Sequence, residues 1–188
     1  MVLNSGNTHP YGFAWFFDEV AGQLVTEHSG AWQGFVNQYT RFPRQDLSVI
    51  VLTNARSTMS APLAMQIGAL IDPELTPEPP PTEAIVDDPT VSAYVMDMLE
   101  RMSDGSLEWT DFDFVRQTVF PRMKAALEAQ LAGRGRPDDL TLLARKQVGD
   151  DTELEYRAAW GDRGMRVTLT IGPDGGLTNF VFLTPDPR

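Results

Sequence analysis

Residues 11–54, YGFAWFFDEVAGQLVTEHSGAWQGFVNQYTRFPRQDLSVIVLTN, contain the apolar runs and turn signals that decide the fold of the first half of the chain. The runs predict four strands, at residues 11–20, 22–28, 34–42 and 47–54. Ala21-Gly22, Ser29-Gly30 and residues 43–46 carry the turn residues between them. Short connections between successive strands indicate an antiparallel meander.

The fourth predicted strand is apolar at nearly every position from Leu47 to Leu52, which is typical of a strand covered on both faces in the middle of a sheet. A helix over residues 62–71 would cover one face, ended by Pro73 and capped by Ser57, Thr58 or Ser60. Its expected apolar stripe consists of Leu63, Ile67, Leu70 and Ile71. The sequence offers no cover for the other face.

A segment rich in proline and acidic residues, 76–90, divides the chain into a region at 1–75 and a domain at 91–188. Its composition favours extended, self-repelling chain over packing. In the second domain, Asp88 and Pro89 open a helix that ends near Gly105. Its apolar positions are Val91, Tyr94, Val95, Met98, Leu99 and Met102.

A second helical region is predicted from Asp111 to Leu131, split in two by Pro121 and stopped by Gly133. Its apolar side consists of Phe112, Val115, Val119, Met123, Leu127 and Leu131. Four strands follow, at 140–148, 153–160, 165–171 and 177–183. Helices followed by a meander predict an α+β domain, so the whole chain is predicted as α+β with antiparallel sheets.

The composition narrows the classes of partner. A formal net charge of -11, with 15 Lys plus Arg against 26 Asp plus Glu, argues against nucleic acid, whose binding needs clustered cations. The chain has no cysteine, which excludes disulfides and thiolate metal sites but leaves the compartment open. No membrane partner is expected, because no run of about 18 apolar residues is present. No cofactor and no metal are expected either.

The order and spacing of five short pieces resemble the closing region of β-lactamase-related serine hydrolases, a family that includes class C β-lactamases, D,D-peptidases and esterases. The resemblance covers about residues 8–72. The pieces are Tyr11 to Phe16, His28-Ser29-Gly30, Gly34-Phe35, Arg41-Phe42-Pro43 and Val49 to Asn54.

In that family the third conserved box, Lys-Thr-Gly or His-x-Gly, lies on the strand that walls the active site. The resemblance places this box at His28, Ser29 and Gly30. It implies that His28 faces the substrate, that Gly30 lets substrate backbone approach, and that the backbone N–H of Ala31 is one oxyanion-hole donor.

The family's nucleophile lies in a Ser-x-x-Lys box, and this sequence contains none. Its two lysines, Lys124 and Lys146, are preceded three residues earlier by Pro121 and Leu143. No Tyr-x-Asn box is present either. Because both boxes precede the third one in the family, the sequence is expected to be a truncated hydrolase that is inactive by itself.

Several residues have plainer interpretations. His28 is also readable as a solvated histidine at a strand end. The aromatic residues are interpreted as core or interface packing rather than as a ligand groove. They are Trp15, Phe16, Phe17, Trp32, Phe35 and Tyr39. The acidic residues Asp104, Glu108, Asp111 and Asp113 lack the spacing of a calcium loop and are interpreted as solvated surface.

An alternative function is a non-catalytic binding or oligomerisation module in residues 91–188. Helices followed by a curved four-stranded sheet resemble NTF2-like accessory domains, which hold ligands between helix and sheet or pair with a copy of themselves. The doubly apolar fourth strand, without a second cover, also predicts self-association or packing against the chain's own second domain.

Overall fold

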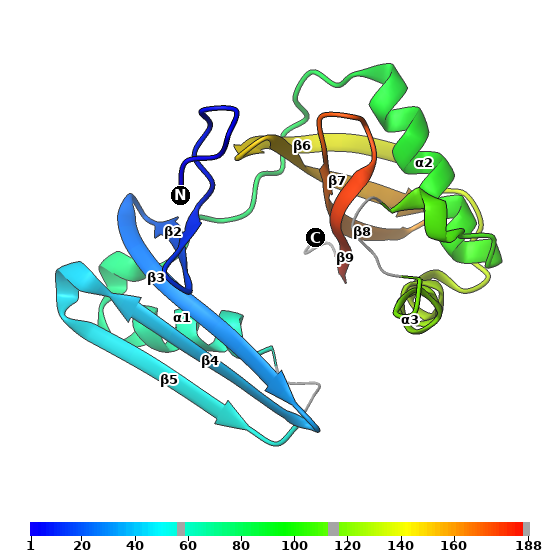
Figure 1. The fold of residues 1–188 in the computed structure, drawn as a ribbon. Helices are drawn as coiled ribbons and strands as arrows, with labels where there is room; N and C mark the ends of the chain where they lie inside the picture. The colour runs from blue at the N-terminus through cyan, green and yellow to red at the C-terminus, as the bar shows by residue number, and fades with distance from the viewer. Residues whose placement is uncertain (56–58, 113–116, 186–188) are drawn as a thin grey trace. The chain divides into compact units, whose positions relative to one another are not determined.

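The computed structural model describes residues 1–55, 59–112 and 117–185, with the backbone alone for 180–185, and it divides into two compact units, 1–80 and 81–188 (Figure 1). Both units combine helices with an antiparallel sheet, so the predicted α+β class is confirmed. The division falls inside the proline-rich segment 76–90. Among the described residues, no helix is long and apolar enough to cross a membrane.

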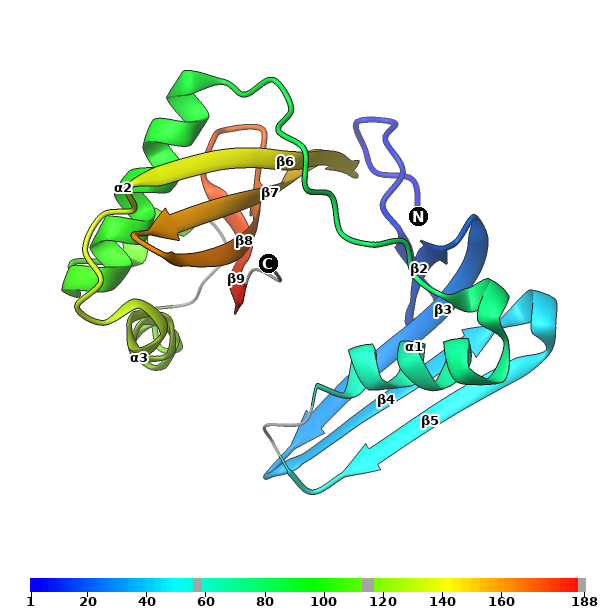
Figure 2. The same cartoon turned by 180° about the vertical axis from the view of Figure 1, so that it is seen from behind.

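Unit 1 is a five-stranded antiparallel meander in the order β1-β2-β3-β4-β5. The strands are β1 (Tyr11–Gly12), β2 (Trp15–Val20), β3 (Gln23–Trp32), β4 (Phe35–Phe42) and β5 (Leu47–Thr53). A 3-10 turn η1 (Pro43–Gln45) joins the last two, and α1 (Ser60–Ile71) and η2 (Pro73–Leu75) follow. The helix lies across one face of the sheet, which Figure 2 shows from the helix side.

Two predicted connections in this meander are wrong. Residues 11–20 form a hairpin rather than one strand, because Phe13 and Ala14 take positive φ values of 52° and 64° and turn the chain. Ser29-Gly30 lies within β3, and the turn comes at Gln33-Gly34, with φ values of 41° and 99°. Paired strands therefore override a local Ser-Gly turn signal.

The fourth predicted strand, β5, forms an edge of the sheet, so the prediction of a central position is wrong. Val49 and Val51 are buried against the helix side, whereas Ile50 and Leu52 are 60% and 79% exposed. The continuous apolar run therefore has one buried face and one uncovered face in this unit.

The contact face of α1 also differs from the prediction. Ile67 packs against the core as predicted, but Leu63, Leu70 and Ile71 are exposed, and Ala64 and Gly68 are the fully buried contact residues. A Cβ on Gly68 would lie 2.6 Å from Cζ of Phe42, so only glycine allows this approach of helix to sheet. Met59 occupies the N-cap position without a side-chain cap, Ser60 is inside the helix, and residues 57 and 58 lie outside the described residues.

Unit 2 packs its helices on one face of a four-stranded meander ordered β6-β7-β8-β9 (Figure 1). The elements are α2 (Pro89–Asp104), η3 (Trp109–Asp111), α3 (Phe120–Leu131), β6 (Asp139–Val148), β7 (Asp151–Trp160), β8 (Arg163–Ile171) and β9 (Leu177–Pro185). The four predicted strands are confirmed. Among the residues whose side chains are described, sixteen buried ones form one core between the two helices and the sheet.

Local signals set the limits of α2. The Asp88 side chain accepts a hydrogen bond from the backbone N–H of Thr90, and Gly105 ends the helix at a φ of 80°. Pro121 lies in the first turn of α3, so it begins this helix and does not split a longer one. Val119 is exposed, and Val115 lies outside the described residues.

The last part of segment 76–90 packs on unit 2, which its composition did not indicate. The N–H of Ile85 donates to the carbonyl of Leu142, and Asp87 accepts from the hydroxyl of Tyr156 at 3.0 Å. The guanidinium of Arg166 donates to the carbonyl of Pro81 at 2.9 Å. Three side-chain and backbone bonds thus hold this acidic stretch along the second sheet.

Candidate functional site

The four residues of the predicted third box lie consecutively in β3. His28, Ser29, Gly30 and Ala31 pair in register with Tyr39, Gln38, Asn37 and Val36 of β4. Strand alternation puts Ser29 and Ala31 on the face that carries α1, and His28 and Gly30 on the uncovered face. The box therefore presents its histidine and its glycine to the same side of the sheet.

The side chain of His28 is exposed, and the backbone carbonyl of the next residue orients the ring. Nδ1 lies 2.7 Å from the carbonyl oxygen of Ser29. A carbonyl can only accept, so Nδ1 carries the hydrogen and the neutral ring keeps its lone pair on Nε2. The rings of Tyr11 and Phe16 lie 6.2 and 5.8 Å away, centroid to centroid. This tautomer leaves Nε2 as the nitrogen able to take a proton.

Gly30 is needed for packing within the sheet. A Cβ at this position would lie 2.8 Å from Oδ1 and 3.0 Å from Nδ2 of Asn37, the cross-strand partner. The amide of Asn37 therefore lies across the glycine, and any larger residue would have to displace it. A ligand could reach the glycine more readily from the edge of the strand than through this face.

The outer edge of β3 is open along the box. β2 pairs with β3 only as far as Phe16 opposite Glu27, and in the described part of the chain no other strand pairs with residues 28–32 on that side. Outward backbone N–H and C=O groups of such an edge can bind an added extended chain. The box thus lies on the one stretch of β3 that has a free edge.

A polar cluster on the helix-side face was not identified in the sequence. Nε2 of Gln38 donates to Glu27 at 2.8 Å and to Thr40 at 3.2 Å, while Oε1 of Gln38 is buried without a partner. Burial raises the pKa of Glu27, and nearby Asp18 raises it further, against the opposing hydrogen bond from Gln38. No spacing rule could have found this cluster, because register brings its members together from β3 and β4.

The raised pKa of Glu27 predicts a pH dependence of stability. A carboxyl whose pKa is higher in the folded than in the unfolded state favours folding below its unfolded pKa, and that contribution is lost as pH rises through the folded pKa. Glu27→Gln removes the titration. Urea unfolding from about pH 4 to pH 7 should show wild type losing stability relative to the variant as pH rises. A difference that stays flat contradicts this, and exposed Glu19→Gln is the control.

The uncovered face of the unit 1 sheet is rich in large apolar side chains. On this face Trp32 is 74% exposed and Phe35 59%, and Phe17 is also exposed. Phe16 is exposed as well, but it pairs with Glu27 and therefore lies on the helix-side face. These four aromatic residues are not core residues of unit 1, so of the predicted packing roles only an interface role is left for them. Trp15 and Tyr39 are half-buried and in mutual ring contact at 5.2 Å.

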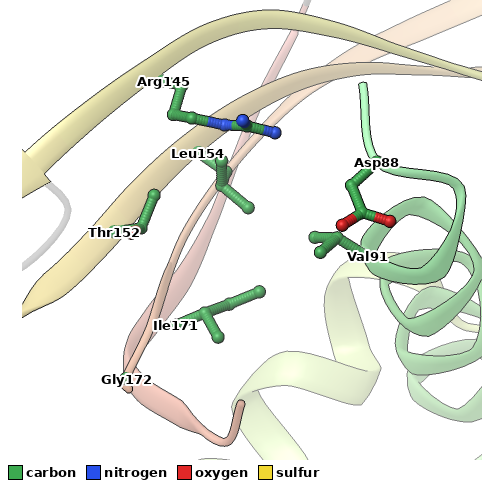
Figure 3. Close-up of a pocket in the computed structure, with 7 residues that line it drawn as sticks. All are labelled: Asp88, Val91, Arg145, Thr152, Leu154, Ile171 and Gly172. Atoms are coloured by element: carbon green, nitrogen blue, oxygen red, sulfur yellow. The ribbon is translucent and has the colours of Figure 1, made fainter. Parts of the chain in front are cut away.

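Unit 2 contains a separate cavity of about 230 Å³ between the start of α2 and the sheet (Figure 3). It is lined by Asp88, Val91, Arg145, Thr152, Leu154, Ile171 and Gly172. Its floor is apolar, and two charged side chains reach it from opposite elements. None of these residues was singled out in the sequence as a site residue.

The acidic residues considered for calcium serve local structure. Asp104 accepts hydrogen bonds from Ser106, and the carboxylate of Asp111 binds the guanidinium of Arg101 through two contacts of 2.7 Å. Asp113 lies outside the described residues. Across the ranges that the structure describes, no three His, Asp or Glu side chains are grouped as metal ligands.

Comparison with known proteins adds no relative. No protein-family model matches the chain, and no curated protein matches it.

Proposed function

We propose that this chain is the C-terminal portion of a β-lactamase-like serine hydrolase, which carries the third active-site box on β3. The observation that supports this most is the location of the box: His28 to Ala31 occupy the stretch of β3 whose outer edge is open. A hydrolase of this type would place its acyl substrate along such an edge. Residues 81–188 form an accessory domain in this proposal.

The chemistry follows from the orientation of each group. Nε2 of His28 can accept or return a proton, and the backbone N–H of Ala31 is the proposed oxyanion donor, worth about 3 kcal/mol in such sites. Acyl transfer also needs a nucleophile and its activating base. The sequence contains no Ser-x-x-Lys, so the wall is proposed to act only together with a segment that supplies it.

The first expected result is the absence of turnover by this chain alone. Nitrocefin and a p-nitrophenyl ester should be hydrolysed no faster than in buffer, because a site without its nucleophile retains little beyond binding. A class C β-lactamase in the same assay is the positive control. Clear catalysis that survives His28→Ala would sink the proposal.

We also propose that the uncovered sheet face drives self-association or is covered by the second unit. Monomeric proteins seldom expose a contiguous apolar patch of this kind, here including Trp32, Phe35 and Leu52. Light scattering after size-exclusion chromatography should give a dimer or larger species, which Leu52→Lys shifts towards monomer. Exposed Leu70→Lys on α1 controls for the added charge. If the wild-type chain is a monomer with unit 1 folded, self-association is ruled out. The alternative that is left is that unit 2 covers this face.

A second candidate function, a binding module in residues 91–188, is favoured by one specific observation, the cavity beside α2. That function needs neither a nucleophile nor the strands of unit 1.

A further inference from the structure

The position of Arg145 in unit 2 is unusual because it places a charge on the apolar face of the sheet. Arg145 pairs with Leu154, a core residue that faces the helices. A register shift between Leu142 and Ala144 inserts an extra residue in β6. Without it, strand alternation from buried Leu142 would put Ala144 on the inner face and Arg145 on the outer face. The bulge therefore turns the guanidinium towards the cavity.

The guanidinium has no hydrogen-bonding partner within the described residues. Arg145 forms neither a hydrogen bond nor an ion pair with any of them. Figure 3 shows it extending from β6 over the cavity, above Leu154. A cation held above an apolar floor by a bulge is suited to an anionic group of a ligand.

A carboxylate lies on the opposite side of the same cavity. One oxygen of Asp88 caps α2 through the N–H of Thr90 at 2.9 Å, and the side chain lines the cavity without reaching Arg145 as an ion pair. Its neighbour Asp87 is already used, since it accepts hydrogen bonds from Tyr156 and Ser92 at 3.0 and 2.8 Å. Asp88 is thus the acceptor left for a cationic or donor group of a ligand.

The rest of the lining sets the size and character of the ligand. Val91, Leu154 and Ile171 form an apolar surface between the two charges. The volume, about 230 Å³, is below the roughly 300–1,000 Å³ of pockets for drug-sized molecules. On the rim, a Cβ at Gly172 would lie 2.6 Å from Cγ2 of Thr178, so this wall is closely packed. The space suits a small molecule.

We propose that this cavity binds a small zwitterion with an apolar body, of the class of an aliphatic amino acid. Its carboxylate binds the guanidinium of Arg145, its ammonium binds the carboxylate of Asp88, and its side chain lies on Val91, Leu154 and Ile171. The proposal concerns residues of unit 2 alone and goes beyond the hydrolase function. Its failure would leave the proposal for β3 untouched.

The test is a titration of the full chain with leucine, followed by amide chemical shifts. Leucine should shift the amides of Thr152 and Gly172. Leucinamide, which lacks the carboxylate, and 4-methylpentanoate, which lacks the ammonium, should each bind at least about tenfold more weakly. Equal binding of either analogue overturns the zwitterion assignment. No saturable shift with any of the three overturns the site.

Variants test the same contacts. Arg145→Gln should lower the affinity for leucine at least about tenfold. Val91→Phe should abolish leucine binding, because the larger side chain fills the cavity. Lys146→Gln is the matched control, because it removes the same charge from the neighbouring position of β6, on the opposite face beside Glu153. Leucine affinity unchanged by Arg145→Gln, or lowered equally by Lys146→Gln, contradicts the proposal. If a variant misfolds, the titrations of the unmodified chain with leucinamide and 4-methylpentanoate still test the proposal.

Discussion

Replacing Phe42 with alanine should destabilise unit 1 by about 3–5 kcal/mol and leave the stability of unit 2 unchanged. Phe42 is 1% exposed and is the largest of the seven buried core residues in the described part of unit 1. Truncating a buried phenylalanine to alanine lowers the free energy of unfolding by about 3–5 kcal/mol. The whole free energy of unfolding of a domain is about 5–15 kcal/mol, so this loss is a large share of it. The backbone of Gly68 lies directly against the ring, so the helix cannot fill the gap with a side chain.

The measurement is urea unfolding of the full chain, with the indole resonance of Trp15 reporting unit 1 and that of Trp160 reporting unit 2. Leu70→Ala on α1 is the control, since it shortens a large side chain of the same unit that is 84% exposed and lies outside the proposed interface face, and it should change stability by less than about 0.5 kcal/mol. Equal effects of the two substitutions would show that Phe42 is not the centre of the core.

Replacing Glu155 with leucine should destabilise unit 2 by about 3 kcal/mol. The carboxylate accepts from the guanidinium of Arg166, whose side chain is only 7% exposed, and the same guanidinium holds the carbonyl of Pro81. Removing the carboxylate takes the counter-charge of Glu155 away from a buried cation. Glu100→Leu, which breaks an exposed pair with Arg136, should cost about 0–1 kcal/mol.

Adding Arg166→Met to Glu155→Leu should recover part of the loss, because the buried cation that Glu155 balanced is then removed as well. Denaturant unfolding followed through the Trp160 indole gives the free energy of unfolding of both single variants and of the double variant. A double variant that is less stable than the sum of both single changes would contradict this account of the pair.

The sequence predicted elements whose limits are set by local chemistry. The helix from Pro89 to Asp104 was placed correctly because Asp88 caps it and Gly105 ends it. The alternation of β7 was also readable, since Leu154, Tyr156 and Ala158 are all buried. In these cases the residues that decide the structure are neighbours in the chain.

Features decided by distant residues could not be predicted. Hydrophobicity favoured Leu63 and Leu70 as the packed face of α1, but close approach to Phe42 selects Gly68 and Ala64. The turn at Phe13 and Ala14 uses residues that seldom adopt positive φ. The bulge before Arg145 exchanges the inward-facing and outward-facing positions of β6, and no residue type at that point of the sequence indicates it. The resemblance predicted the box at residues 28–31, but the local turn signal placed Ser29-Gly30 between two strands. Its position within β3, its open edge and the amide of Asn37 above Gly30 required the fold.

The central claim is that β3 belongs to a serine hydrolase site. The most direct test isolates the native protein from its source cells with an antibody against residues 81–188, labels it with a fluorophosphonate and a fluorescent penicillin, and locates the label by mass spectrometry. The account predicts label on a serine of a Ser-x-x-Lys box that is joined to this chain or bound to it. An isolate in which no such serine is labelled, while a class C β-lactamase treated alongside is labelled, would contradict it.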